Sequence, residues 1–326
     1  MDISVIIGQT AKLFIILCLG FALARLELLD LHTKQKLTKI LLYVTTPLMM
    51  IDAFYDRMKM QDLQLSSDSH ASVPVGMLFI YAFAFYFIMI ALSLLLTLVI
   101  RPPKSDRRLY IFMTIFGNVG FMGFPLVQSV YGTEGLFYAA IVNSVFNIFV
   151  YTFGVVLMGG AGDAENVPLK KRIRTIPWKK LLLTPAVIGT AVGILIFVFR
   201  IHLPDIIADT CGTLGDLTSP LAMLVVGANL SGMKGREVLT NMRMNIYVLL
   251  RQTALPLIFW LLISRIVQHP VLTPTLLLMC CMPVANTTAL FATEYNGNEK
   301  LASQGIFLTT LFSLVSFPLI IWICVK

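Results

Sequence analysis

The sequence predicts an all-α polytopic membrane protein, with ten transmembrane helices arranged as two inverted repeats of five. The first observation is composition, since 57% of the 326 residues are hydrophobic and only 13% are charged. The second is that apolar runs of about 18 residues or more recur between basic or turn-forming breaks, and about 20 residues span a hydrocarbon core. The third is that two of these runs are interrupted at corresponding places in the two halves of the chain.

Each predicted span is an apolar run bounded by polar residues. In the first half we expect spans at about 4–25, 37–54, 73–100, 109–131 and 136–158, and in the second half at about 182–199, 217–230, 245–267, 271–294 and 301–325. The least hydrophobic stretch, the basic linker 159–180, separates the repeats 1–158 and 181–326.

Basic residues predict the orientation of these spans. The connections after odd-numbered spans are rich in lysine and arginine, whereas those after even-numbered spans hold firmly only Arg57, Lys59 and Arg200. Since basic loops stay in the cytoplasm, we expect a cytoplasmic linker, both termini outside, and a location in the plasma (inner) membrane. This topology also explains the net charge of +8 without a nucleic-acid partner.

The interrupted spans carry the prediction of function. Glycines, an asparagine and a proline between Gly117 and Pro125 weaken the helix, and a second interruption covers 282–288. Irregular backbone survives inside a bilayer only against protein or a water-filled cavity. Two broken helices in matching halves are typical of the binding site of a secondary transporter.

Short echoes support the repeat. Gly132-x-Glu134-x-Leu136 recurs as Gly297-x-Glu299-x-Leu301, each just after an interrupted span, and the segment 45–50 is echoed at 218–223. Because each half has an odd number of spans, the two halves must enter the membrane from opposite sides.

The amides of Asn118 and Asn286 are candidate substrate contacts. Each amide can donate to a carboxylate while freed backbone N–H groups add a positive field, although each could instead cap its broken helix. The hydroxyls of Thr287 and Thr288 either add to the site or bond to their own helix. Met122 and Gly123 complete the predicted substrate-binding set, with core packing as the alternative for Met122. We expect the crossover itself to be formed by Gly117, Gly120, Pro125 and Pro283.

Arg251 is the charge that lies deepest in a predicted span. An arginine inside the membrane is costly and indicates a function. It could attract an anion, or hold a structural partner such as a carbonyl near a broken helix, and we favour the partner. Lys12 is expected to reach the interface. The carboxylates at span ends, such as Glu134, include no obvious proton carrier.

The sequence contains no pattern that predicts catalysis or a cofactor. The five cysteines and four histidines show no metal-ligand spacing, and neither a nucleotide-binding glycine loop nor a hydrolase arrangement occurs. We therefore expect no enzymatic activity, no metal and no cofactor.

Four segments in order resemble the auxin efflux carrier family over nearly the whole chain. Asn118-x-x-x-Met-Gly-Phe-Pro-Leu126 is similar to the family's fourth span, and Pro283 followed by Phe291-Ala-Thr-Glu-Tyr-Asn296 is similar to its ninth. Leu214-Gly-Asp with Pro220-Leu-Ala-Met, and Arg251 with Pro256, resemble the seventh and eighth.

This resemblance implies the ten-helix fold of bile-acid/sodium symporters. Helices 1, 2, 6 and 7 would form a scaffold with a homodimer contact, and helices 3–5 and 8–10 an elevator-type transport unit. The short linker departs from the long loop of many plant carriers and favours the bacterial organic-acid permease branch. The expected substrate is a small organic carboxylate of the malonate or malate kind. The alternatives are a sodium-coupled anion symporter, an auxin-like or indole-acid exporter, and a membrane sensor that does not transport.

Overall fold

The structure is a computed structural model that describes residues 3–63, 73–159, 183–232 and 241–324, so the predicted linker 159–180 lies almost wholly outside the described residues. Within those ranges the chain is helical, and every predicted span has a helical counterpart. The first half comprises α1 (Ile3–Arg25), α2 (Leu31–Ile40), η1 (Leu41–Thr45), α3 (Thr46–Leu63), α4 (Val75–Ile100), α5 (Arg107–Ile115), η2 (Val119–Gly123), α6 (Phe124–Phe149), η3 (Val150–Gly154) and α7 (Val155–Met158). The second comprises α10 (Pro185–Phe199), α11 (Asp205–Asp216), α12 (Thr218–Ser231), α14 (Met242–Gln252), α15 (Ala254–Ile266), α16 (Leu272–Cys281), α17 (Thr287–Glu294) and α18 (Glu299–Cys324).

Six helical segments of the described chain are long and apolar enough to cross a membrane. They are Leu31–Met60, Val75–Ile100, Val119–Met158, Asp205–Ser231, Met242–Ile266 and Glu299–Cys324. Two shorter apolar helices, Pro185–Phe199 and Leu272–Cys281, accompany them. The chain is therefore an integral, multi-pass membrane protein by the length and composition of its helices.

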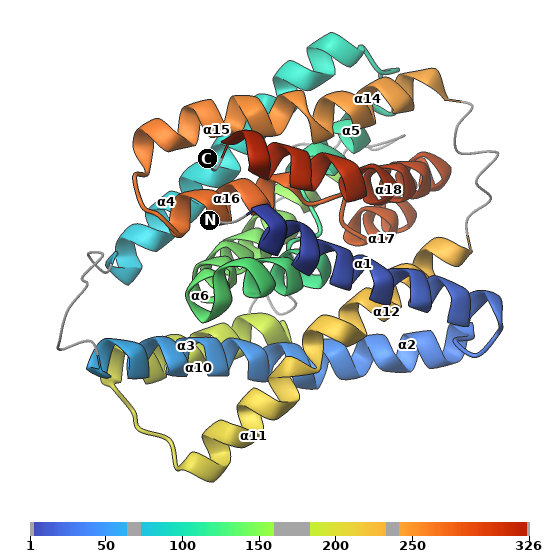
Figure 1. The fold of residues 1–326 in the computed structure, drawn as a ribbon. Helices are drawn as coiled ribbons and strands as arrows, with labels where there is room; N and C mark the ends of the chain where they lie inside the picture. Colours follow the sequence, from blue (N-terminus) through green and yellow to red (C-terminus); the bar gives the residue numbers. More distant parts are fainter. Residues whose placement is uncertain (1–2, 64–72, 160–182, 233–240, 325–326) are drawn as a thin grey trace.

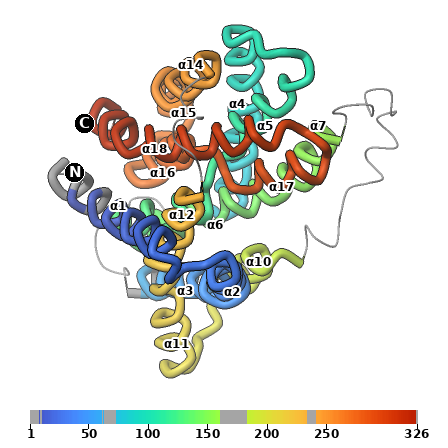
Figure 2. Tube along the Cα trace, turned by 90° about the vertical axis from the view of Figure 1, so that its right-hand side faces the viewer, coloured from blue at the N-terminus to red at the C-terminus, as the bar shows by residue number. Residues whose placement is uncertain are grey.

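The helices form two groups around α6 (Figures 1 and 2). In both views α2, α3, α10 and α11 lie on one side, while α4, α5, α14, α15, α16 and α18 lie on the other. The helices α1 and α12 cross between them. The start of α1 and the end of α18 lie on the same side of the molecule.

Glycines set a very close contact between α1 and α12, the two helices that cross between the groups. A Cβ added to Gly227 of α12 would lie 1.9 Å from the carbonyl oxygen of Leu17 in α1, and one added to Gly20 would lie 2.3 Å from that of Leu224. Small residues allow two helix backbones to approach this closely, which is a common source of packing energy between membrane helices.

The helix boundaries differ from the predicted spans at the second span, before the seventh span and within the eighth, and they agree with the prediction at Gly132. The second span is part of a longer helical segment, Leu31–Leu63, and the amphipathic helix α11 was not expected. Gly132 divides α6, because its φ of 60° and ψ of −152° are not helical, and glycine adopts that backbone without a Cβ penalty. This kink is the turn expected between the fourth and fifth spans. The eighth span breaks at Thr253, between α14 and α15.

Candidate functional site: the paired helix breaks

The two interrupted helices meet backbone to backbone at their breaks. Gly117 and Val284 form an isolated antiparallel bridge. The N–H of Asn118 donates to the carbonyl of Pro283 over 2.7 Å, and the N–H of Ala285 donates to that of Phe116 over 3.0 Å. Each break thus satisfies part of the backbone that the other leaves open, which is how irregular chain is tolerated at membrane depth.

Asn118 also starts the helix that follows the first break. Its side-chain Oδ1 accepts from the N–H of Phe121 over 3.2 Å, and its carbonyl accepts from Met122 and Gly123 across a π-helical turn. Its Nδ2 has no acceptor among the described residues, although the side chain is 95% buried from solvent. The oxygen therefore caps the helix, as one of the two alternatives required, whereas contact of the nitrogen with a substrate stays a prediction.

The second break leaves the start of α17 unpaired. Asn286 precedes α17 and its side chain makes no capping bond. Within the described residues, no acceptor is found for the backbone N–H of Asn286 or Thr287, or for the Thr287 hydroxyl. Unpaired N–H groups at a helix start give the site a partial positive charge.

A cavity of about 680 Å³ lies at the paired breaks. Its polar surface comes from four asparagines, Asn118, Asn143, Asn147 and Asn286, and from Thr46, Thr184 and Thr287. Its apolar walls include Phe121, Phe124, Phe146, Tyr43 and Tyr151. The cavity reaches the molecular surface near Tyr43 and Leu183, which are 66% and 65% exposed.

None of the described lining residues carries a charge. Amide groups and helix starts can still bind an anion, since both offer N–H donors without the desolvation cost of a buried cation. The described residues also contain no group of histidine, cysteine or carboxylate side chains suited to a metal ion.

The predicted site residues divide between this cavity and the layer behind it. Gly117, Asn118, Gly120, Asn286 and Thr287 line the cavity. Met122 and Pro283 instead border a small apolar void of about 20 Å³, together with Met282 and Phe317. Gly123 packs against Met279, where an added Cβ would lie 2.9 Å from the sulfur. Thr288 is fully buried, and Pro125 lies in the first turn of α6.

Sequence reasoning missed the contribution of α6 to the cavity. Asn143 and Asn147 are four residues apart, so they lie on one face of the helix. The side chain of Asn147 donates to the carbonyl of Asn143 over 2.8 Å. Two asparagines at this spacing within a long apolar run were the available signal, because polar residues in a span usually face the bundle interior.

Arg251 lies behind the first break and outside the cavity. It is fully buried, and its Nε donates to the carbonyl of Met113 near the end of α5 over 3.2 Å. Its two terminal nitrogens have no partner among the described residues, and one would lie 3.4 Å from a Cβ added to Gly117. The cation therefore faces the carbonyl end of a half-helix, where positive charge is favourable.

Comparison with known proteins agrees with this architecture. The family described as membrane transport protein, that of the auxin efflux carriers, matches residues 5–321. The chain belongs to this transporter family.

Two known proteins align with the chain at 27% identity. An uncharacterized transporter of Methanocaldococcus jannaschii aligns over 227 residues, covering 65% of this chain and 67% of the relative. An uncharacterized transporter of Methanothermobacter thermautotrophicus aligns over 210 residues, covering 62% and 63%. The alignments thus span about two thirds of each relative.

Membership in the membrane transport protein family explains why a multi-pass helical protein encloses a polar cavity at two broken helices. It also favours a role other than catalysis.

Proposed function

We propose that the protein is a secondary transporter of an organic carboxylate that works by elevator-type alternating access. The observation that carries this proposal is the cavity at the paired breaks, where uncharged N–H donors converge. The carboxylate would accept from the Nδ2 of Asn118 and from the unpaired N–H groups that begin α17. The amides of Asn143 and Asn286 would complete its shell.

The size and walls of the cavity bear on the class of acid. A compact dicarboxylate of the malonate or malate kind is the substrate that the sequence predicts. The cavity of about 680 Å³ has room for an acid with a larger apolar part, and its aromatic side chains could contact that part. Aromatic rings bury large apolar areas favourably, which supports an indole-acid-like or other amphipathic monocarboxylate as the second candidate.

The arrangement of helices supports the two-repeat plan of this proposal. The helices α1 and α12, which correspond to the predicted first and seventh spans, contact each other. The helices α3 and α10, which correspond to the second and sixth spans, do the same. Exchanging the predicted repeats, 1–158 with 181–326, turns one pair into the other, as an inverted repeat requires. The scaffold would comprise α1, α3, α10 and α12, and it would supply the contact of a homodimer.

The cavity reaches the surface beside the start of α10, which follows the predicted cytoplasmic linker. With the orientation predicted from basic residues, this conformation is open to the cytoplasm. The small apolar void bordered by Met122, Met282 and Phe317 lies across the crossing and would be part of the closed side.

Purified protein in liposomes tests the proposal. Counterflow of labelled malonate, malate and indole acids should reveal accumulation of at least one acid. The same panel should raise the apparent Tm in a concentration-dependent way. If an acid raises the apparent Tm but none of the acids shows counterflow, the result would instead favour a membrane sensor. Flux that requires sodium would identify a sodium-coupled symporter.

A further inference from the structure

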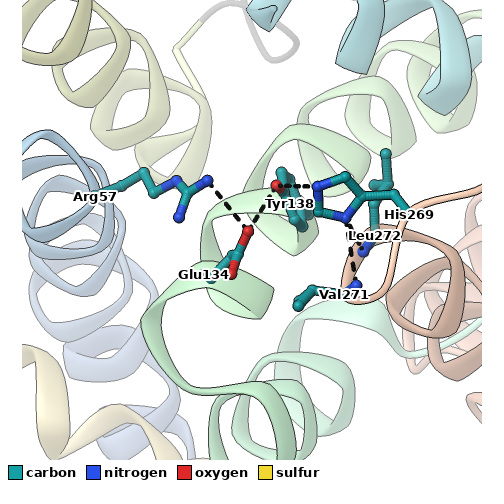
Figure 3. A network of polar contacts seen from close by, with 6 residues as sticks. All are labelled: Arg57, Glu134, Tyr138, His269, Val271 and Leu272. Atoms are coloured by element: carbon teal, nitrogen blue, oxygen red, sulfur yellow. Dashed lines mark hydrogen bonds and ion pairs between the residues drawn. The ribbon is translucent and has the colours of Figure 1, made fainter. Parts of the chain in front are cut away.

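A chain of polar contacts joins α3, α6 and the connection that precedes α16 (Figure 3). Arg57 of α3 pairs with Oε1 of Glu134 over 3.1 Å. The hydroxyl of Tyr138 donates to the same oxygen over 2.9 Å and lies 3.5 Å from Nε2 of His269. We name this set, Arg57, Glu134, Tyr138 and His269, the polar latch.

The contacts of His269 fix its protonation state. Its Nδ1 accepts from the N–H groups of Val271 and Leu272, over 3.3 and 3.1 Å, at the start of α16. An imidazole nitrogen that accepts carries no proton, so the proton of the neutral ring lies on Nε2. Nε2 then donates to the Tyr138 oxygen, and the Tyr138 hydroxyl donates to Glu134. Along the latch, each hydrogen bond is thus donated toward Glu134, first from His269 to Tyr138 and then from Tyr138 to Glu134.

Protonation of His269 is incompatible with this arrangement. A proton on Nδ1 would face two N–H donors, and both backbone groups would lose their acceptor. The imidazolium would also place a positive charge at the start of α16, where the helix dipole disfavours it. Among the described residues, the titratable or charged groups that His269 contacts directly or through Tyr138 are Tyr138 and Glu134 of α6, with Arg57 of α3 behind them. Glu134 is already neutralised by Arg57.

The latch joins the proposed scaffold to the transport unit, which moves relative to the scaffold in our proposed mechanism. Arg57 belongs to α3 of the proposed scaffold, whereas Glu134 and Tyr138 belong to α6, and His269 holds the first half of the interrupted ninth helix. All three segments are predicted to lie on the outer side, opposite the opening of the cavity. The contact would therefore have to break before the site could open outward.

We propose that the polar latch is a proton-binding site, with His269 as the acceptor, whose occupation releases the transport unit for outward opening. This inference rests on the proposed function and adds its coupling ion, H⁺. In the closed conformation His269 is neutral and makes the contacts of the latch. In the released conformation His269 is protonated and these contacts are broken. Acid on the outer side therefore shifts the population toward the released state, since a ligand favours the state that binds it better. This assigns a proton site at span ends where the sequence indicated no proton carrier.

The test is a distance measurement without substrate. Spin labels at Met60→Cys and Gln268→Cys, both on exposed positions beside the latch, report the separation of α3 from the start of α16. Exposed Cys18 is replaced by serine in every variant. Between about pH 8 and about pH 5, the range in which histidine titrates, the distance distribution of the otherwise unchanged protein should shift to longer values.

Two variants and a control make the test specific. His269→Asn keeps an acceptor for the α16 start but takes up no proton, so its distribution should not respond to pH. Tyr138→Phe breaks the chain, so its distribution at about pH 8 should already match that of the acid form. His32→Asn, at an exposed position of α2, should respond as the unchanged protein does.

A pH response retained by His269→Asn, or absent from the unchanged protein, overturns the proton site. If no acid is transported yet the response is present and lost in His269→Asn, the proton site stands and the proposed transport function falls.

Discussion

The backbone N–H of Asn118 donates to the carbonyl of Pro283 over 2.7 Å, so the first break is held to the second without any side chain. Substituting the Asn118 side chain should therefore leave the crossing intact while removing its free Nδ2 from the cavity. We expect Asn118→Ala to lower kcat/KM for the transported acid at least tenfold, which corresponds to about 1.4 kcal/mol, an ordinary value for one hydrogen bond to a charged group. Initial rates of uptake into liposomes measure it, with Asn229→Ala in α12, outside the cavity, as the matched control. Uptake equal to that of the unchanged protein would remove Asn118 from the site.

Gly117 and Gly120 offer a paired test of the crossing. A Cβ on Gly117 would lie 3.2 Å from the carbonyl oxygen and 3.3 Å from the Cβ of Met282, whereas the nearest atom to one on Gly120 is 4.0 Å away. Gly117→Ala should lower the free energy of unfolding by about 1 kcal/mol or more, because backbone atoms of the opposite break must shift. Gly120→Ala should unfold like the unchanged protein. Thermal unfolding in one detergent compares them, and equal Tm values would show that the crossing is looser than described.

The contact between α1 and α12 should tolerate substitution least. Gly227→Ala would bring a methyl group to within 1.9 Å of the Leu17 carbonyl oxygen, so the two helices must separate. We expect a loss of about 3 kcal/mol or more of stability, near the upper end of overpacking effects. Gly232→Ala, with its nearest atom at 4.0 Å, is the control. Detergent-solubilised yield and Tm report the difference, and similar values for both variants would contradict close packing here.

A substitution of Asn143 tests whether the negative charge of the substrate lies near this side chain. Asn143→Asp introduces a carboxylate into a cavity whose described lining is uncharged. Like charges a few ångströms apart repel by about 4 kcal/mol at an effective dielectric constant near 20, so KM for an anionic substrate should rise at least tenfold. Asn143→Leu removes the amide without adding charge and should raise KM less. Concentration dependence of uptake separates the two, and equal KM values would place the carboxylate of the substrate elsewhere.

Arg251 tests whether a buried cation serves stability or transport. Its terminal nitrogens have no partner in the described structure, so Arg251→Met should not lower the Tm appreciably. Transport should nevertheless fall, since the positive field behind Gly117 is lost, while Arg251→Lys should retain more activity. Tm and uptake are measured on the same preparations. A large drop in Tm for Arg251→Met would show that the Met113 contact, and not the field, is its role.

Much of the fold followed from apolar run length, because burial in a bilayer leaves little choice of secondary structure. Each predicted span has a helical counterpart. One break lies between Gly117 and Pro125 and the other at Pro283, where glycine and proline weaken the hydrogen bonds of the helix. The helix α11 was missed because its polar residues, such as Asp205 and Asp209, make it too weakly apolar to read as a span.

The site was predictable only in part. Asn118 and Asn286 lie in broken helices and were named from the sequence, whereas Asn143 and Asn147 lie in an unbroken one. Met122 was placed with Asn118 because the two are close in sequence, yet a π-helical turn directs it into the opposite layer. The latch depends on Arg57, Glu134 and His269, which only the tertiary packing brings together.

The uncharged lining of the cavity has a consequence for pH. Its described lining residues include no aspartate, glutamate, histidine, lysine or arginine. In the His269→Asn background, the pH profile of binding between about pH 3 and about pH 8 should therefore follow the ionisation of the free acid alone. An unknown substrate would thus reveal its own acidity through the protein, and that acidity would help to name it.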